Sequence, residues 1–304
     1  MIAGTEDTRY AFANGIIRAR EARLLNRSQF DRLMSAGLES FSVILADTPY
    51  AADRDLLRSI AVEERKVREF FNKYCFHNEV RQLIDWPEQV HNLKVKIKNG
   101  SAELLYENPG SEVESWPEIA SLVERYASDK DPFILSTSFD KILCHYLLQK
   151  ASFAPFFMMF YQLNFDLENI RSFFRARNFE NSRDIFEQVF ISYGRIEYKM
   201  FAENLSAPLD VLGKVFFTTP YLFLIEKGGL FIEQNYSFLR LERLCEERRL
   251  EFLRQARFLT FGVEPLFGYY QMKMSEMKKL RQVYWGKINE VPIDQLKESI
   301  SDVW

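Results

Sequence analysis

Histidine and cysteine are the residues best suited to hold a metal or to act as a nucleophile, and this chain has few of either. The three histidines and three cysteines are widely spaced: His77, His91, His145, Cys75, Cys144 and Cys245. Cys75 with the two histidines that follow it, or the adjacent pair Cys144 and His145, could in principle meet around zinc. A structural zinc site needs four ligands at compact spacing, and no HExxH or CxxC motif occurs. The sequence therefore predicts no metal site, and we expect these residues to pack as ordinary core or half-buried side chains.

Motifs that bind phosphate or carry an activated serine are also missing from the sequence. There is no GxxxxGK[ST] loop, no GxGxxG turn and no GxSxG elbow. Two pairs of adjacent acids, Glu63-Glu64 and Glu246-Glu247, have the residue type of a general acid–base couple. Both lie in charge-rich helical segments, which favours a solvated helix face. The sequence thus predicts no catalytic residue and no cofactor.

Two Arg-Ala-Arg segments, Arg18–Arg20 and Arg175–Arg177, could bind an acidic partner. Acids stand near each of them in the sequence, so local ion pairs are an equally good interpretation. The aromatic run from Phe153 to Tyr161 could form a binding stripe, because exposed apolar patches mark interfaces. Core packing is the more frequent explanation for such a run in a helical protein with few glycines.

The elements that would position these side chains are expected to be helices. Apolar residues recur at three- and four-residue spacing in several segments. Examples are Ala13, Ile16, Ile17 and Leu24; Ile60, Val67, Phe70 and Tyr74; Phe139, Ile142, Tyr146 and Leu147; and Tyr270, Met274, Met277 and Tyr284. The one alternating stretch, Leu93–Lys98, could be a strand, but its neighbourhood favours a helix. The fold class predicted is all-α.

Expected helix starts are marked by capping residues. Ser28-Gln29-Phe30-Asp31 is a possible capping box. Thr48-Pro49, Asp131-Pro132 and Thr219-Pro220 each offer a cap residue followed by proline at the first helical position.

Length and composition describe a large folded protein with little excess charge. The 304 residues include 40 Lys and Arg and 43 Asp and Glu, for a net charge of −3. A nucleic-acid binder needs a basic excess, so that class is disfavoured. The densest apolar stretch, Phe153–Tyr161, is about half the ~20 residues of a membrane-spanning helix and contains Pro155, so no span is expected.

Internal repetition is the most informative feature of the sequence. Residues 30–50 align without a gap on residues 201–221, an offset of 171, and both segments end in Thr-Pro-Tyr. The residues of these two boxes are Thr48, Pro49, Tyr50, Thr219, Pro220 and Tyr221. A shorter pattern, Asn92-Leu93-Lys94, recurs as Asn169-Ile170-Arg171 and more loosely as Lys279-Leu280-Arg281. One helical unit used several times would explain both repeats.

Loop residues cluster between Asn99 and Pro117, and more weakly near Glu226–Gly229. Each of these segments is a candidate domain boundary.

Several motifs, in order along almost the whole chain, resemble the C-subunit family of V/A-type rotary ATPases, whose eukaryotic member is known as the d subunit. The motifs are Gly15–Leu25 with Phe30 and the first Thr-Pro-Tyr box, Asn92–Lys94, Asp166–Arg171 with Arg175–Arg177, Gly194–Ile196, Glu264–Tyr270, Glu276–Arg281, Gly286–Asn289 and Pro292. One departure is Tyr193-Gly194, where the family usually has two glycines.

The resemblance implies an all-helical, funnel-shaped subunit with three similar lobes around a pseudo-threefold axis. Together with the two candidate boundaries it implies helical lobes at 1–110, 111–225 and 226–304. The last lobe is short, and closure of a threefold ring would have the N-terminal helix complete it. Such a subunit sits on the membrane proteolipid ring, receives the central shaft of the catalytic head, and has no active site. It would be cytoplasmic, peripheral to the membrane, and would couple ATP synthesis or hydrolysis to proton or sodium transport.

Two other functions remain open at this point. A helical adaptor of the tetratricopeptide kind would repeat every 34 residues or so, but the offsets here are 171 and 77. A metal-dependent helical enzyme would need carboxylates and histidines clustered on one helix face, and no such cluster is visible.

Overall fold

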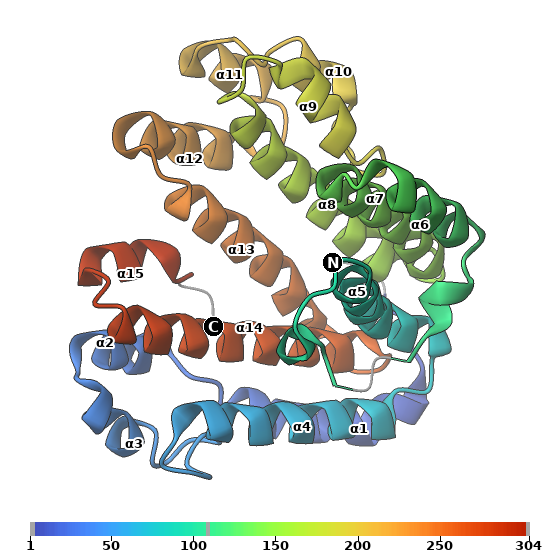
Figure 1. The fold of residues 1–304 in the computed structure, drawn as a ribbon. Helices are drawn as coiled ribbons and strands as arrows, with labels where there is room; N and C mark the ends of the chain where they lie inside the picture. Colours follow the sequence, from blue (N-terminus) through green and yellow to red (C-terminus); the bar gives the residue numbers. More distant parts are fainter. Residues whose placement is uncertain (1–3, 108–109, 302–304) are drawn as a thin grey trace. The chain divides into compact units, whose positions relative to one another are not determined.

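The chain is all-α, as the sequence predicts. The computed structural model describes residues 4–107 and 110–301, and every regular element within these ranges is a helix. The chain forms two compact units (Figure 1): unit 1 comprises Met1–Phe76 and Leu209–Trp304, and unit 2 comprises His77–Pro208. The division into three lobes at residues 110 and 225 remains a prediction.

Unit 1 is built from both ends of the chain. Its α-helices are α1 (Ala11–Glu21), α2 (Arg27–Ser35), α3 (Phe41–Ile44), α4 (Leu56–Tyr74), α11 (Leu209–Val215), α12 (Leu222–Asn235), α13 (Leu239–Leu253), α14 (Glu264–Ile288) and α15 (Ile293–Ser299). Short 3₁₀ turns cover Thr8–Tyr10, Leu38–Ser40 and Arg254–Phe258.

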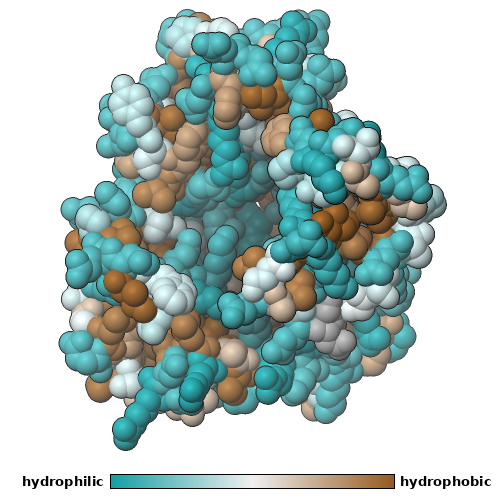
Figure 2. All heavy atoms as spheres, in the orientation of Figure 1, coloured by the Kyte–Doolittle hydropathy of each residue, from teal (hydrophilic) through white to brown (hydrophobic). Residues whose placement is uncertain are grey.

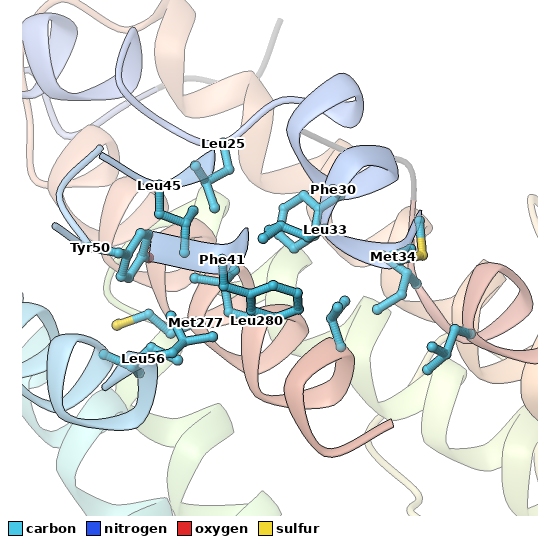
Figure 3. Close-up of a cluster of buried hydrophobic side chains, with 14 residues drawn as sticks. Leu25, Phe30, Leu33, Met34, Phe41, Leu45, Tyr50, Leu56, Met277 and Leu280 are labelled. Atoms are coloured by element: carbon cyan, nitrogen blue, oxygen red, sulfur yellow. The ribbon is translucent and has the colours of Figure 1, made fainter. Parts of the chain in front are cut away.

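The long helix α14 runs through the core of unit 1. In Figure 1 it lies alongside α4, about two hundred residues earlier in the chain, and α1 and α2 also pack against it. Its buried Met277 and Leu280 meet side chains of α2, α3 and the following turn, including Phe30, Phe41 and Tyr50 (Figure 3). Burial of such side chains stabilises the fold by about 1.5–3 kcal/mol each. The two ends of the chain therefore share one hydrophobic core.

Unit 2 is a continuous segment of the chain. Its α-helices are α5 (Asn78–Ile97), α6 (Pro117–Asp129), α7 (Pro132–Ala151), α8 (Pro155–Ala176), α9 (Ser182–Val189) and α10 (Tyr198–Ala202), with 3₁₀ turns at Ala102–Leu104 and Glu112–Ser115. Four members of the aromatic run, Phe156, Phe157, Phe160 and Tyr161, lie on α8 and are buried, whereas Phe153 precedes α8 and is half-buried. The core interpretation of that run is thus confirmed for these four residues.

The caps of the helices differ from the sequence expectation at three places. Asp131 caps α7 through the N–H groups of Phe133 and Ile134, as predicted. The predicted box at Ser28 is wrong: Asn26 caps α2, and its partner is Gln29. The Thr-Pro pairs at residues 48 and 219 do not begin helices. After the first pair the next long helix, α4, starts at Leu56 and is capped by Asp55. After the second pair α12 starts at Leu222 and has no side-chain cap.

The expected loop and strand alternatives are also resolved. Leu93–Ile97 is the last turn of α5, so the helical interpretation is confirmed. The segment from Asn99 to Trp116 contains only short 3₁₀ turns, and α6 begins at Pro117; residues 108 and 109 lie outside the described residues. Glu226–Gly229, in contrast, is not a loop but part of α12. Gly228 there lets Leu241 of α13 approach to within 2.7 Å of the position a Cβ would take.

Candidate functional site

The two Thr-Pro-Tyr boxes form the same tight turn. Thr48 donates its hydroxyl to the Leu45 carbonyl at 2.7 Å and accepts from the Tyr50 amide at 3.2 Å. In the second box Thr219 donates to the Phe216 carbonyl at 2.8 Å and accepts from the Tyr221 amide at 3.3 Å. Threonine thus caps a turn here and not a helix, because its oxygen bonds on both sides of the proline. Both tyrosine side chains are buried.

Tyr50, the last residue of the first Thr-Pro-Tyr box, is part of a buried ionic network. Its hydroxyl donates to Glu276 Oε1 at 2.5 Å, and Lys273 Nζ reaches the same oxygen at 2.6 Å. Lys273 also pairs with Glu63 at 3.3 Å and lies over the Tyr50 ring at 4.5 Å. Burial, and then the Glu276 carboxylate, raise the pKa of Tyr50 well above its usual value. The tyrosine therefore stays protonated and donates to the carboxylate.

Glu276 also holds a loop. Its second oxygen accepts from the Leu25 amide at 2.5 Å, between α1 and α2. The buried carboxylate thus has a backbone donor, a tyrosine and a lysine as partners, which offsets the cost of burying its charge. The helix α14, from the C-terminal part of the chain, fixes the N-terminal part at this point.

A helix in unit 2 holds a loop in the same manner. Asp166 of α8 is fully buried and accepts from the amides of Arg195 and Ile196 at 2.8 and 3.0 Å. One turn further along α8, Asn169 exchanges two hydrogen bonds of 2.9 Å with the backbone of Ile191. The loop before α10 is therefore fixed by side chains spaced three residues apart on one helix face.

The helix α5 holds a third loop with amide side chains alone. Asn92 exchanges two hydrogen bonds with the backbone of Tyr106, at 3.1 and 2.8 Å. Three residues before it, Gln89 accepts from the Val113 amide at 3.2 Å. The asparagines of the short sequence repeat thus perform the same task on two helices.

Gln89, Asp166 and Glu276 each bond the backbone of a loop, and we call them the holding sites. Their positions correspond along the sequence. Asp166 and Glu276 are 276 − 166 = 110 positions apart, and the residues that they hold, Ile196 and Leu25, are 196 − 25 = 171 apart. The first offset equals that between Asn169 and Lys279, and the second equals that of the long repeat. The structural correspondence thus extends the repeat beyond the aligned sequence segments.

The same offset of 110 relates two sets of three helices. Moving α7, α8 and α9 forward by 110 positions places them on α13, α14 and α15 within a few residues, except that α7 is longer at its end. We call α13, α14 and α15 the ionic module, and α7, α8 and α9 the apolar module. Each module lies within one unit.

Charged side chains join the helices of the ionic module. Glu298 of α15 pairs with Arg240 and Arg243 of α13, at 2.8 and 3.5 Å. Glu246 of α13 binds Arg249 at 2.7 Å and accepts from Ser275 of α14 at 2.6 Å. Burial disfavours the charge of Glu246, but the arginine and the two hydrogen bonds outweigh it and lower its pKa to about 2. The three helices are therefore connected by ionised groups.

The apolar module contains a groove of about 810 Å³ between its helices. At six of its lining positions an apolar residue replaces a polar or charged one of the ionic module: Phe133 for Arg243, Cys144 for Arg254, Phe179 for Asn289, Ile185 for Gln295, Val189 for Ser299 and Ile191 for Ser301. Gln188 stands at the position of Glu298, so the ion pairs that join α13 to α15 have no counterpart between α7 and α9 among these residues.

A second, more open groove, of about 680 Å³, lies between α11 and α12 of unit 1. Phe217 on its edge is 71 % exposed, and Phe223 nearby in the sequence is 57 % exposed. By the offset of 171, these positions carry Ala46 and Ala52 in the first copy of the repeat. Figure 2 shows hydrophobic residues in separate patches on one face. The two copies of the turn thus differ in the apolar surface beside them.

The histidines and cysteines take ordinary roles. His91 bonds the Leu104 carbonyl, His145 bonds the Tyr193 hydroxyl, and His77 stacks on Phe153. All three cysteines are buried as thiols and form no disulfide. Within residues 4–107 and 110–301, no group of three potential ligands is placed to hold a metal ion. In the same ranges no helix is long and apolar enough to cross a membrane.

The charged pairs proposed from the sequence are only partly on solvated faces. Glu63 is buried against Lys273, so the prediction of a solvated face is wrong for this residue. Arg18 forms an ion pair with Glu21, and Arg177 donates to three backbone carbonyls beyond α10. These two arginines therefore act within the chain, as the local interpretation expected.

Sequence reasoning missed the holding residues Gln89, Asp166 and Glu276, and the groove of the apolar module. Asp166 and Glu276 begin two of the motifs named above, but only their hydrogen bonds show that they hold loops. The signal was nevertheless present, because each stands three positions before the Asn or Lys of the short repeat.

Comparison with known proteins gives a consistent result. A family model described as ATP synthase (C/AC39) subunit matches residues 76–299. The chain is 22 % identical to the C subunit of the V-type sodium ATPase of Enterococcus hirae, covering 97 % of this chain and 99 % of that protein. It is 24 % identical to the C subunit of the A-type ATP synthase of Pyrococcus furiosus, covering 97 % and 91 %.

Proposed function

The chain belongs to the family of ATP synthase (C/AC39) subunits, and from this premise we propose that it is the non-catalytic central-stalk subunit of a V/A-type rotary ATPase. It joins the rotating shaft of the catalytic head to the proteolipid ring of the membrane. In this role it couples ATP synthesis or hydrolysis to the transport of protons or sodium ions. It is a cytoplasmic subunit that lies against the membrane as part of the complex.

The observation that carries the proposal is the match to this family over residues 76–299, together with relatives that match over almost their full length. Both relatives are named as C subunits of rotary ATPases, one V-type and one A-type. A role in the same position of a rotary complex is the simplest function that these relationships support.

The internal construction suits a part that transmits torque. Loops are fixed to long helices by buried side chains at Gln89, Asp166 and Glu276, which limits the freedom of the connections. Closely packed interiors are stiff and transmit strain. The repeated arrangement supports the proposal of three similar lobes, with the N-terminal segment completing the last one through Leu25.

Co-purification from native membranes tests the proposal. The chain, tagged and expressed in its own cells, is extracted in mild detergent and should bring down catalytic, shaft and ring subunits in fixed ratio. The outcome that overturns the proposal is an intact rotary complex recovered from the same cells without this chain. A soluble bystander protein carrying the same tag serves as the control for non-specific capture.

A further inference from the structure

Four charged side chains are buried together where the N-terminal part of the chain packs on α14. They are Glu63 of α4 and Lys273, Glu276 and Lys279 of α14, and each is at most 8 % exposed. Charged groups leave water at a high cost, so such side chains are rarely buried unless they are paired. Lys273 meets this condition, because its Nζ lies 2.6 Å from Glu276 and 3.3 Å from Glu63. Lys279 is the member of the cluster whose surroundings differ.

Lys279 borders a small cavity of about 20 Å³, formed by α2, α13, α14 and the loop that joins α1 to α2. Glu276 also lines it, and the other lining side chains that the structure describes are apolar: Leu24, Leu25, Phe30, Leu250 and Met272. A cavity of this size holds one water molecule when at least two polar groups face it. The carboxylate of Glu276 and the ammonium of Lys279 are two such groups.

Burial makes the charged form of Lys279 unfavourable. It lowers the pKa of this lysine from the usual 10.5 to about 8, against the attraction of nearby carboxylates. The charged groups that act on Lys279 are Glu246, Glu247 and Arg249 of α13 and Glu276 of α14, whereas α2 and the loop before it bring apolar side chains. The surroundings of the ammonium therefore replace only part of the hydration that it has in water.

We propose that a water molecule occupies this cavity while Lys279 is protonated and leaves it when the lysine becomes neutral. An ammonium group donates three hydrogen bonds, and the water supplies an acceptor for one of them. The same water donates to Glu276 and so competes with the Leu25 amide, which bonds this carboxylate at 2.5 Å. The contact between the loop and α14 is thus weaker at neutral pH than in mild alkali. This pH-sensitive joint does not depend on the proposed function.

Titration of the unaltered protein tests the first step. In protein labelled with ¹³C-lysine, the Cε chemical shift of Lys279 follows its protonation by NMR, and exposed Lys278 on the same helix serves as the reference. We expect Lys279 to lose its proton near pH 8, well before Lys278 does. Equal midpoints for the two lysines would overturn the proposal.

The variant Lys279→Met removes the charge and keeps the length of the side chain. Because the unfolded chain binds this proton more tightly, the unfolding equilibrium constant of the wild type should fall at least tenfold from pH 7 to pH 9.5. The fall should be absent from Lys279→Met and present in the control Lys278→Met. The same pH dependence in Lys279→Met and wild type, or a Lys279→Met variant less stable than wild type at pH 7, contradicts the account.

Hydrogen exchange connects the lysine to the loop. At pH 7 the Leu25 amide should exchange at least threefold more slowly in Lys279→Met than in the wild type or Lys278→Met, while amides of α8 in unit 2 keep their rates. An unchanged or faster Leu25 amide would show that the loop does not sense the lysine.

Crystal structures at pH 6.5 and pH 9.5 locate the water itself. We expect it within hydrogen-bonding distance of Lys279 and Glu276 at the lower pH, and a dry cavity at the higher pH. A dry cavity at pH 6.5, or the same water at both values, would overturn the proposal.

Discussion

The ionic module closes on itself through charged side chains, whereas the apolar module has the same three helices and keeps a groove between them. Glu298 binds Arg240 and Arg243 across the first module, and in the second the corresponding residues are Gln188, Lys130 and Phe133. The backbone elements correspond, so the difference arises from side chains. Helices at corresponding positions can therefore be joined by ion pairs in one place and leave a groove between them in the other.

The largest effect is expected where the charges are buried most deeply. Glu276→Leu removes the acceptor of Leu25 and Tyr50 and one of the two carboxylates beside buried Lys273. Breaking such a network should lower the free energy of unfolding by about 3–5 kcal/mol, measured by urea denaturation. The counterpart Asp166→Asn keeps an oxygen for both backbone donors and should cost only ~1 kcal/mol. A loss of 3–5 kcal/mol in Asp166→Asn as well would show that the Asp166 site depends on its charge and not only on its two acceptor bonds.

Acid should weaken the ionic module through Glu246. Its pKa is about 2, below the usual 4.5, so its ionised form stabilises the folded chain. This stability is complete above about pH 4.5 and disappears as the pH falls towards 2, and the shift corresponds to about 3 kcal/mol. The difference in unfolding free energy between the wild type and Glu246→Gln should therefore be constant near neutral pH and shrink below pH 4.5. A difference independent of pH down to 2 would contradict this account.

The loop held by Asp166 has no space for a side chain at Gly194. A Cβ at this residue would lie 2.2 Å from Asp166 Oδ1, so Gly194→Ala must displace the loop, with an expected loss of about 2 kcal/mol. By the offset of 171 the corresponding residue is Arg23, two positions before Leu25, whose amide Glu276 holds. Arg23 is exposed, and Arg23→Ala should change the stability by less than ~0.5 kcal/mol in the same denaturation experiment. An unchanged free energy of unfolding in Gly194→Ala would contradict this steric conflict.

The smallest effect is expected at the partly exposed ion pairs of α15. Glu298→Gln gives the ionic module the residue found in the apolar module and removes the pairs with Arg240 and Arg243. Because these groups are partly hydrated, the loss should be about 0.5–1 kcal/mol and should decrease in high salt. In the apolar module the positions of these arginines carry other residues, so Gln188→Glu should not raise the free energy of unfolding. A gain in that variant would show that the two modules are closer in charge environment than described.

The fold could be predicted from the sequence to the extent that local patterns decide it. Apolar spacing places the helices, and Asp131-Pro132 marks a true helix start. Thr48-Pro49 shows the same pattern but forms a turn, because its threonine bonds the carbonyl of Leu45 behind it. The same turn is also held by a tertiary contact, from Tyr50 to Glu276 of α14, which a local sequence pattern does not contain.

The candidate site was harder to predict for a related reason. The equivalence of Asp166 and Glu276 is one of position and bonding, and the two residues differ in length. Periodicity also indicates which helix face is apolar without indicating which element covers it. For that reason the aromatic run of α8 could be assigned to the core, whereas the groove bordered by Phe179 could not be found.

The bond between Leu25 and Glu276 has a consequence for the order of folding during synthesis on the ribosome. Residues 77–208 hold all of unit 2, so the contacts within that unit can form before residues 209–304 are made. Residues 4–76 emerge first but wait for α14, made some two hundred residues later, to receive their core and their buried carboxylate. The nascent N-terminal segment therefore needs protection from aggregation for longer than any other part of the chain.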